Sequence, residues 1–253
     1  IKDSTRDLSL TKDRLEKANR ELEALNKAKT AFFSDISHEL RTPLTAIKGA
    51  ADIISRKYPG ESPQYLDIIK RNVDHLTKLV VDFLDFSKIE DGQIELELRE
   101  GSLRETIEAA IKSFESEVSA KSLTIMPDCS ETKSFFDLTR IFQVMTNLIT
   151  NAIRFSPDGG VIRITEEVLD GKMIRVKVED QGPGIPEKHQ DEIFNKFYRV
   201  KDAGNASFQK GSSGIGLSIC KSLVEAHGGR IWMENIAGSG AKFVFDIPMR
   251  PIP

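Results

Sequence analysis

Apolar residues return every seven positions along the first part of the chain, and this repeat restricts the fold more than any other feature of the sequence. The repeat occupies two heptad positions, one holding Leu8, Leu15, Leu22, Lys29 and Ile36 and the other Thr11, Ala18, Leu25 and Phe32. Such a repeat keeps one seam of an α-helix apolar, which is the pattern of a coiled coil. We therefore predict a single helix from about residue 9 to about residue 57 that packs against another helix.

A second amphipathic helix follows a break at residues 58–63, where the sequence is YPGESP. Pro59 and Gly60 disfavour helix, and Ser62 followed by a proline is typical of a new helix start. Apolar residues then recur at spacings of three and four up to about Gly92, namely Leu66, Ile69, Val73, Leu76, Val80 and Phe83. Two antiparallel helices leave apolar surface uncovered, so we predict that two copies pair into a four-helix bundle. A coiled-coil spacer without chemistry would explain both helices equally well.

His38 is the first residue that a spacer does not explain. It lies two positions after Ile36, about 200° around the helix, on the side opposite the apolar seam. Glu39 beside it can hold a ring proton, and Pro43 removes a helical hydrogen bond and bends the helix. Most single exposed histidines have no special role. An exposed imidazole next to a carboxylate and a bend is nevertheless suited to act as a nucleophile toward a mobile partner.

The hydrophobic pattern changes after Gly92, where short alternating segments interleave with segments of helical period. We predict strands at 93–100, 123–126, 230–235 and 241–247, a strand pair at 160–180 that turns at Asp170-Gly171, and helices at 102–122, 138–156, 186–197 and 214–229. Ser102, with Glu105 three residues later, marks a helix start as a capping box. This order predicts an α/β sandwich in which helices cover one face of a mixed sheet.

Polar residues share one face of the helix predicted at 138–156. Asn147 and Asn151 are four residues apart, and Arg154 continues the same face. Asparagine is a poor residue for a helix interior, so the pattern indicates a polar site on this helix. The alternative is a pair of solvent-exposed amides.

Two glycine-containing loops have the composition of ligand-binding loops. Asp180 ends a predicted strand and is followed by Gly182 and Gly184, where glycine lets the main chain approach a ligand. The sequence KGSSGIGLSI leads directly into a helix, and its main-chain N–H groups and positive helix end suit a phosphate chain. Each cluster by itself is more typical of a turn. The sequence has no P-loop, no complete GxGxxG motif and no protein-kinase signature set.

The composition excludes several classes of protein. The 253 residues are 39% hydrophobic and 30% charged, which allows one or two globular units with real cores. The net charge of −3, with interspersed charges, gives no attraction for nucleic acid. Cys129 and Cys220 are too few for a metal cage or a disulfide framework, and they fit a reducing compartment. No apolar run reaches the roughly 20 residues that cross a bilayer. We expect a cytoplasmic chain, and its start at Ile1 rather than Met leaves open a membrane-anchored full-length protein.

Six motifs, in this order, resemble the H, N, G1, F, G2 and G3 boxes of bacterial sensor histidine kinases: SHELRTPL, NLITNAIRFSP, EDQGPGIP, IFNKFYRV, GSSGIGLSI and GSGAKF. The resemblance extends from about residue 29 to residue 248. It implies an α+β chain with a coiled-coil signalling helix at 1–30, a dimerization and histidine-phosphotransfer domain at 31–92, and a catalytic ATP-binding domain of the gyrase and heat-shock chaperone type at 93–253. The implied activity is ATP-dependent autophosphorylation of a histidine, followed by phosphotransfer to an aspartate in the receiver domain of a separate response regulator.

The resemblance also implies roles for residues that match the boxes. His38 would be phosphorylated, Glu39 would be its acid–base partner, and Thr42 would position water when the kinase dephosphorylates the regulator. Asn151 would hold Mg²⁺, and Asp180 would accept a hydrogen bond from the adenine amino group. The residues expected around ATP are Asn147, Asn151, Arg154, Phe155, Asp180, Gly182, Gly184, Lys196, Arg199, Gly214, Ile215, Gly216 and Leu217.

Several positions depart from the family pattern, but no reacting group is lost. They are Arg154 for the more frequent lysine, Phe155 for tyrosine, Ser213 for threonine, and Ala241 for a small hydroxyl residue. A nucleotide-driven conformational switch that phosphorylates no histidine would use the same pocket. A non-enzymatic dimeric scaffold would need losses at Asn151 or Asp180, and both residues are present. The remaining histidines, His75, His189 and His227, are predicted to be structural.

Overall fold

The computed structural model of this chain describes residues 94–198, 200, 214–236 and 240–250, together with part of the sequence before residue 94. In that earlier part the described residues are 12, 15, 16, 19, 40, 42–51, 53, 54, 66, 68–70, 72, 73, 76, 77, 80, 81, 84, 85 and 87. The chain divides into two compact units, Ile1–Val80 and Val81–Pro253.

The first unit is helical at every residue that the structure describes. Several of its apolar side chains face solvent: Leu44, Leu66, Val73 and Val80 are 60%, 58%, 45% and 49% exposed. The two predicted helices are therefore confirmed at the described residues, and apolar side chains stay uncovered within one chain. Most of the predicted coiled-coil seam lies outside the described residues.

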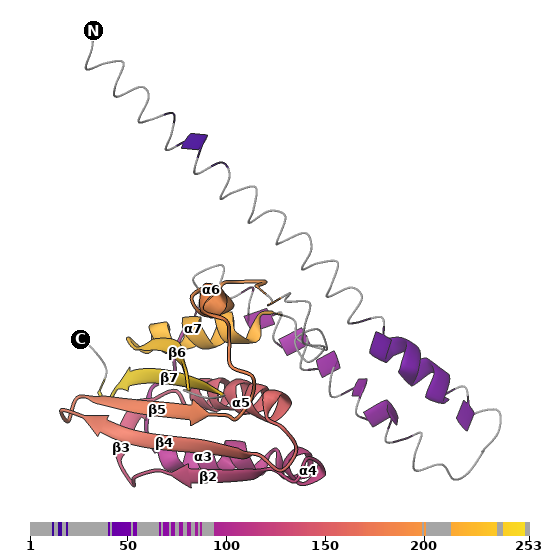
Figure 1. The fold of residues 1–253 in the computed structure, drawn as a ribbon, viewed down its shortest axis with the longest axis horizontal. Coiled ribbons are helices and arrows are strands. Elements are labelled where there is room, and N and C mark those ends of the chain that lie inside the picture. Colours follow the sequence, from indigo (N-terminus) through magenta and orange to yellow (C-terminus); the bar gives the residue numbers. More distant parts are fainter. Residues whose placement is uncertain are drawn as a thin grey trace. The chain divides into compact units, whose positions relative to one another are not determined.

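The second unit contains two β-sheets and a layer of helices (Figure 1). Its strands are β1 (Arg99–Ser102), β2 (Thr124–Asp128), β3 (Lys133–Phe136), β4 (Val161–Leu169), β5 (Met173–Glu179), β6 (Arg230–Asn235) and β7 (Ala241–Pro248). Its helices are α3 (Leu103–Lys112), α4 (Glu115–Ala120), α5 (Leu138–Phe155), α6 (Glu187–Gln190), the 3₁₀ helix η1 (Glu192–Phe194) and α7 (Gly216–Ala226).

The larger sheet has five strands in the order β2-β4-β5-β7-β6. β2 runs parallel to β4, and the other neighbouring strands are antiparallel. β1 and β3 form a separate antiparallel pair. The mixed sheet confirms the fold class predicted from the sequence.

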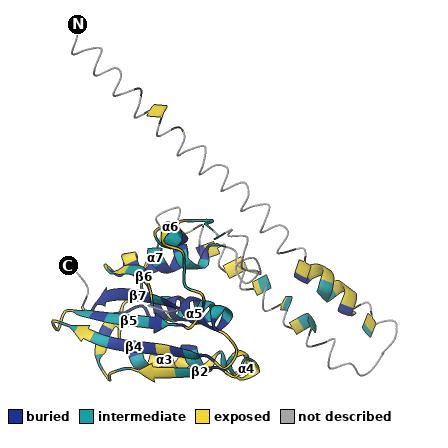
Figure 2. Cartoon of the chain, viewed as in Figure 1, coloured by how far each residue is buried: buried dark blue, intermediate teal, exposed yellow. Residues whose placement is uncertain are grey.

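Helices cover one face of the five-stranded sheet, and the core lies between the two layers (Figures 1 and 2). α5 contacts both α3 and α7, and α7 contacts β6 and β7. Because alternate residues of a strand face opposite sides, every second residue of the central strands is buried under these helices. These core residues are Ile162, Ile164, Ile174, Val176, Val178, Phe243, Phe245 and Ile247.

The opposite face of the sheet carries charged side chains that pair across neighbouring strands. The ion pairs are Arg163–Glu179 at 3.4 Å, Lys177–Glu167 at 2.8 Å, Arg175–Asp246 at 2.7 Å and Lys242–Glu234 at 2.6 Å. The guanidinium groups of Arg175 and Arg230 lie 4.9 and 4.7 Å from the centre of the Trp232 ring. The paired charges suit a face that the described helices of this unit leave uncovered.

The predicted turn between β4 and β5 is confirmed. Asp170 and Gly171 have φ angles of 50° and 64°. They are the central residues of a turn in which the main-chain N–H of Lys172 donates to the carbonyl of Leu169 at 3.0 Å, and Lys172 completes the connection to β5. Asp-Gly is among the pairs that most readily adopt positive φ at both central positions.

Other segments differ from the prediction. Residues 94–98 alternate in sequence but form no strand, and β1 begins only at Arg99. Alternating polar and apolar residues allow a segment to form a strand, but a strand also needs a neighbour that accepts and donates its hydrogen bonds. Here that neighbour is β3, which pairs only with residues 99–102. Strand β3, Lys133–Phe136, was not predicted from the sequence.

Two predicted helices are shorter than expected. The helix predicted at 102–122 is divided into α3 and α4, because the main-chain N–H of Ser113 bonds to the carbonyls of both Ala109 and Ala110 and α3 ends there. The helix predicted at 186–197 is reduced to the single turn of α6 and to η1. In both cases the apolar period continues across a helix end, so periodicity alone does not locate it.

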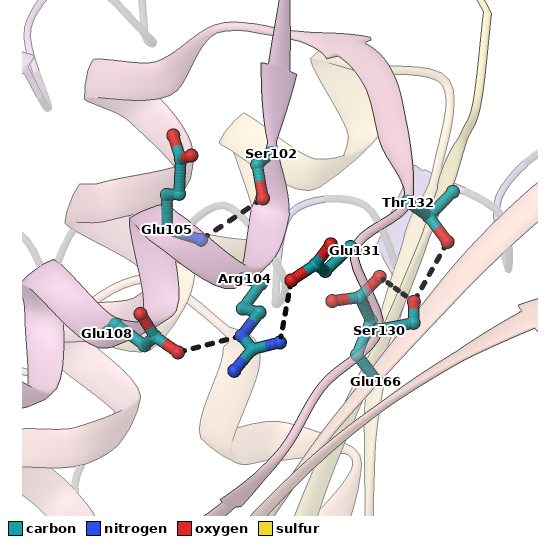
Figure 3. A network of polar contacts seen from close by, with 8 residues as sticks. All are labelled: Ser102, Arg104, Glu105, Glu108, Ser130, Glu131, Thr132 and Glu166. Carbon is teal, nitrogen blue, oxygen red and sulfur yellow. Dashed lines mark hydrogen bonds and ion pairs between the residues drawn. The ribbon is translucent and has the colours of Figure 1, made fainter.

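Figure 3 shows the polar contacts around the start of α3. The Oγ atom of Ser102 accepts a hydrogen bond from the main-chain N–H of Glu105 at 3.3 Å, which confirms the predicted cap. Arg104 pairs with Glu108 at 2.8 Å and with Glu131 at 3.4 Å. These contacts join α3 to the segment before β3.

Glu166 lies in the same region but on the buried side of β4. Its Oε1 atom accepts a hydrogen bond from Ser130 at 2.9 Å, and its buried Oε2 atom has no partner among the described residues. Burial raises the pKa of Glu166, and the Ser130 hydrogen bond offsets only part of that rise. Burial, together with the charge of Glu166, raises the pKa of the Cys129 thiol to about 11, which keeps the thiol protonated at neutral pH.

We predict that Glu166→Gln raises the melting temperature of the second unit at pH 7 to 8. A carboxyl group whose pKa is higher in the folded state stabilises the fold below its unfolded pKa, and that stability is lost as pH rises through the folded pKa. The gain should therefore shrink as pH falls toward the ordinary pKa of glutamate. Thermal unfolding at a series of pH values measures this, with the exposed Glu100→Gln as control. An equal effect of the two substitutions would contradict the prediction.

Candidate functional site

Helix α5 carries the predicted polar face, and its first turn is held by a buried aspartate. Asp137 Oδ1 accepts from the main-chain N–H of Arg140 at 3.0 Å, and Oδ2 accepts from that of Glu97 at 2.9 Å. The main-chain N–H of Asp137 donates to Nε2 of His227 at 3.1 Å, which leaves the ring proton on Nδ1 to bond the carbonyl of Leu223 at 2.7 Å. Burial lowers the pKa of His227, so the ring stays neutral and links α5 to the end of α7.

A lysine holds the other end of α5. The Nζ atom of Lys121 donates to the carbonyls of Ile153 at 2.8 Å, Arg154 at 3.2 Å and Ser156 at 3.0 Å. The last carbonyls of a helix have no partner within the helix and carry partial negative charge. The ammonium group therefore satisfies three of these acceptors at once and fixes the end of α5 at which Arg154 and Phe155 lie.

Asn147 lies in the middle of α5, facing the start of α7. Its side chain is 8% exposed, and its Nδ2 atom has no hydrogen-bond partner among the described residues. A Cβ atom at Gly216 would lie 3.7 Å from Asn147 Oδ1. A buried amide without a partner indicates a ligand or water that completes its hydrogen bonds. The alternative of a solvent-exposed amide is wrong for Asn147, whereas Asn151 and Arg154 are half-buried.

Asp180 follows β5 and is 4% exposed. Its Oδ1 atom accepts from the main-chain N–H of Gly182 at 2.8 Å and from that of Ala241 at 3.2 Å. Among the described residues the structure gives no hydrogen bond to Oδ2. Burial raises the pKa of Asp180, and the two N–H groups partly offset this rise by favouring the charged form.

Gly182 lies between the Asp180 side chain and the end of α5, in close contact with both. A Cβ atom at Gly182 would lie 2.8 Å from Asp180 Oδ1 and 3.0 Å from the carbonyl oxygen of Phe155. Distances of this size exclude any side chain, so the glycine predicted from the sequence is required by close contact. The structure thus brings Phe155, Asp180 and Gly182 together.

Two polar residues that sequence analysis missed hold the same loop. Gln181 Oε1 accepts from the main-chain N–H of Val161 at 2.8 Å. Asn235 Oδ1 accepts from the N–H of Ile185 at 2.9 Å, and Asn235 Nδ2 donates to the carbonyl of Ile185 at 2.8 Å. The partners lie 20 and 50 residues away in the sequence, so no local signal could identify them.

The second glycine loop leads into α7, as predicted. Gly214 has a φ of 70°, Ile215 is buried, and α7 begins at Gly216. Among the described residues, no side chain caps this helix start. Its first main-chain N–H groups are therefore available to an acceptor, and Asn147 lies beside them.

Several predicted site residues are not joined to this cluster by the described contacts. His38, Glu39 and Arg199 lie outside the described residues. Thr42 is an exposed helical residue of the first unit, and Lys196 and Leu217 are half-buried in the second. His189, predicted to be structural, lies with its Nδ1 atom 2.6 Å from the hydroxyl of Tyr198.

Within the described part of the chain, no three His, Cys, Asp or Glu side chains gather in a way that could hold a metal ion. The helices that are described there include none with the length and apolar character needed to cross a bilayer.

Comparisons with known proteins find matches to two family models. The model of the His Kinase A (phospho-acceptor) domain matches residues 28–92, and that of the histidine kinase-, DNA gyrase B- and HSP90-like ATPase matches residues 136–251. The solved structure of Acinetobacter baumannii histidine kinase AdeS is 30% identical, with a TM-score of 0.65, over 84% of this chain and 98% of that one. The chain belongs to the histidine kinase family.

Other histidine kinases resemble the chain over most of its length. Hybrid signal transduction histidine kinase D of Dictyostelium discoideum is 34% identical over 94% of the chain, and sensor histidine kinase WalK of Bacillus subtilis is 30% identical over 91%. The chain spans only 16% and 38% of the length of these two relatives. The structure of histidine kinase ThkA in complex with response regulator protein TrrA matches with a TM-score of 0.60 and 32% identity, over 87% of this chain and 61% of that one.

We predict that Lys121→Met lowers the free energy of unfolding of the ATPase-like unit by about 1 to 2 kcal/mol, because three helix-end carbonyls lose a charged donor. Lys121→Arg keeps the charge and should lose less. Chemical denaturation measures both variants, and Lys112→Met, at an exposed position at the end of α3, is the matched control. A loss of the same size in the Lys112 variant would show that the three contacts contribute nothing.

Proposed function

We propose that this histidine kinase chain binds ATP with Mg²⁺ in the second unit and transfers the γ-phosphoryl group to His38, which then passes it to an aspartate of a separate response regulator. The observation that carries this proposal is the buried carboxylate of Asp180, whose Oδ1 is occupied by two main-chain N–H groups. Its Oδ2 is left for a donor from outside the protein. The exocyclic amino group of adenine is such a donor.

The cluster around Asp180 fits a flat heterocycle. Gly182 leaves no side chain between Asp180 and the end of α5, and the Phe155 ring lies at that end with the guanidinium of Arg154 5.2 Å from its centre. Gly184 lies farther along the same loop. Asp180 would orient the adenine by its hydrogen bond, and the Phe155 ring would supply an apolar contact.

The phosphate end of the ligand is assigned to the start of α7 and to the polar face of α5. The stretch Gly214, Ile215, Gly216 and Leu217 offers main-chain N–H groups, and Asn147 offers an unpaired amide donor. Arg154, Lys196 and Arg199 are the cations proposed to offset phosphate charge. Asn151 would contribute an amide oxygen to Mg²⁺, which usually takes only one or two protein ligands beside phosphates and water. That small number of protein ligands is compatible with the described residues, among which no cluster of metal-binding side chains forms.

Bound ATP supplies an activated phosphoryl group, and Mg²⁺ offsets its charge. The chain supplies the acceptor. The unprotonated Nε2 of His38 forms the bond to phosphorus as the bond to the β–γ bridging oxygen breaks, and ADP leaves. Glu39 holds the Nδ1 proton and stabilises the positive charge that develops on the ring.

The proposed partners are a second copy of the chain and a response-regulator receiver domain. The uncovered apolar side chains of the helical unit and the phospho-acceptor model that matches it support pairing of two copies. The resemblance to ThkA, which was solved in complex with a response regulator protein, supports the second partner. Thr42, exposed near His38 in the sequence, would position water for dephosphorylation of the regulator. We propose that these reactions occur in the cytoplasm.

We predict that Asp180→Asn weakens ATP binding by about 1 to 3 kcal/mol, because an amide donor replaces the acceptor that faces the adenine amino group. The amide oxygen can still accept from Gly182 and Ala241, so the fold should persist. Calorimetric titration with ADP measures the affinity, and the exposed Asp158→Asn is the control. Unchanged affinity in the Asp180 variant would place the adenine elsewhere.

We predict that His38→Gln abolishes incorporation of label from γ-labelled ATP into the chain while ATP affinity changes by less than about threefold, under 1 kcal/mol. The label on the wild-type chain should be acid-labile and base-stable, as a phosphoramidate is. Thr42→Ala, four residues away, should keep autophosphorylation and reduce dephosphorylation of the regulator. If the wild-type chain hydrolyses ATP but retains no label, it acts as a nucleotide-driven conformational switch and not as a histidine kinase.

A further inference from the structure

We propose that Asn235 is a positioning residue of the nucleotide site, holding the loop from Asp180 to Ile185 in its binding shape before any ligand arrives. The proposal rests on the function proposed above, because it concerns the same loop. Asn235 is the last residue of β6 and touches none of the groups assigned to ATP apart from the loop itself. Its effect is therefore indirect.

The side-chain amide of Asn235 uses both of its polar atoms on one residue. Oδ1 accepts from the N–H of Ile185 at 2.9 Å, while Nδ2 donates to the carbonyl of the same residue at 2.8 Å. This is the hydrogen-bond pattern that one strand residue offers its antiparallel neighbour, supplied here by a side chain. Such a pair fixes both the position and the rotation of the Ile185 main chain.

The contact at Ile185 ties the second end of the loop to the strand pair that already holds the first end. Asn235 pairs with Ala241 in the register of β6 and β7. Ala241 in turn accepts from the N–H of Asp180 at 2.9 Å and donates its own N–H to Asp180 Oδ1 at 3.2 Å. The two ends of the loop are thus tied to the same end of the same strand pair. Without Asn235, the Ile185 carbonyl would keep its hydrogen bond from Gln190 Nε2 at 3.0 Å, but Ile185 would lose its tie to this strand pair.

Gly184 shows that the loop and the amide fit closely. Its φ is 70°, and a Cβ atom there would lie 2.9 Å from Asn235 Oδ1 and 3.2 Å from the carbonyl oxygen of Gly240. The glycine therefore has three requirements, a left-handed backbone, the space left by the Gly240 carbonyl and the space left by the Asn235 amide. Only the last of these depends on residue 235.

Asparagine suits this position for reasons of size and chemistry. Aspartate would keep the acceptor for the Ile185 N–H but turn a negative oxygen toward the Ile185 carbonyl. Alanine would remove both bonds. Because the Asn235 side chain is exposed at a strand end, neither substitution removes a core contact, and the fold should survive both.

The experiment compares Asn235→Ala and Asn235→Asp with Glu234→Ala, which alters the neighbouring exposed residue of β6 without touching the loop. In the nucleotide-free chain, amide hydrogen exchange at Ile185 should become about tenfold faster in Asn235→Ala, and less so in Asn235→Asp, as expected for a lost local hydrogen bond. Glu234→Ala should leave it unchanged. Unchanged exchange at Ile185 in Asn235→Ala would overturn the proposal.

Function is measured on the same variants. The KM for ATP and the Kd for ADP should rise about tenfold in Asn235→Ala, because the loop has to be ordered on binding, while kcat at saturating ATP stays within about twofold. If Asn235 had a merely structural role, its removal would lower the melting temperature and kcat, and KM and Kd would not change separately from kcat. Faster exchange at Ile185 with unaltered KM and Kd would show that Asn235 holds Ile185 but does not position the nucleotide site.

A double substitution tests the link to Gly184. Gly184→Ala should weaken ADP binding, and adding Asn235→Ala should cost less than the two single losses together, since the atom that crowds the new Cβ has gone. Strictly additive losses would count against the proposed fit. If the wild-type chain binds no nucleotide, the proposed function fails, whereas the exchange rate at Ile185 still decides whether Asn235 holds the loop.

Discussion

The anchoring of helix α5 at both ends is the constraint on which the rest of the second unit depends. Asp137 and His227 fix its first turn, and the ammonium group of Lys121 binds three carbonyls at its last. Between these anchors the helix buries one face against its neighbours, holds Asn147 beside the start of α7 and leaves Asn151 and Arg154 half-buried. A helix that could slide or fray would place these polar groups differently from one moment to the next. Because both ends of α5 are fixed, these polar side chains keep constant positions relative to one another.

The loop that begins at Asp180 is shaped in a related way, by single contacts between side chains and main chain rather than by its own secondary structure. Asp180, Gln181 and Asn235 each bind main-chain groups of different segments. Main-chain groups that are already fixed lose little conformational entropy when a ligand binds. The free-energy cost of ordering the loop is therefore met during folding and does not reduce the binding affinity. Burial raises the pKa of Asp180, and the main-chain N–H groups of Gly182 and Ala241 offset part of that rise.

Sequence reasoning identified the features that depend on local chemistry. The Asp170-Gly171 turn, the Ser102 cap, the helix of α5 and the glycine at position 182 follow from backbone geometry or periodicity, and all are found. It failed where the determining partner is distant. Residues 94–98 alternate without acquiring a neighbouring strand, and Lys121 and Asn235 look like ordinary surface residues until the fold brings carbonyls 32 to 50 residues away within reach. The roles of His38 and Glu39 were inferred only from neighbouring residues and resemblance.

The ion-paired outer face of the sheet has a consequence for what can dock on it. Arg163, Lys177 and their acidic partners already satisfy one another, so a protein surface placed there would have to remove water from paired charges. Because the removal of water from paired charges is costly, this face favours contact with solvent.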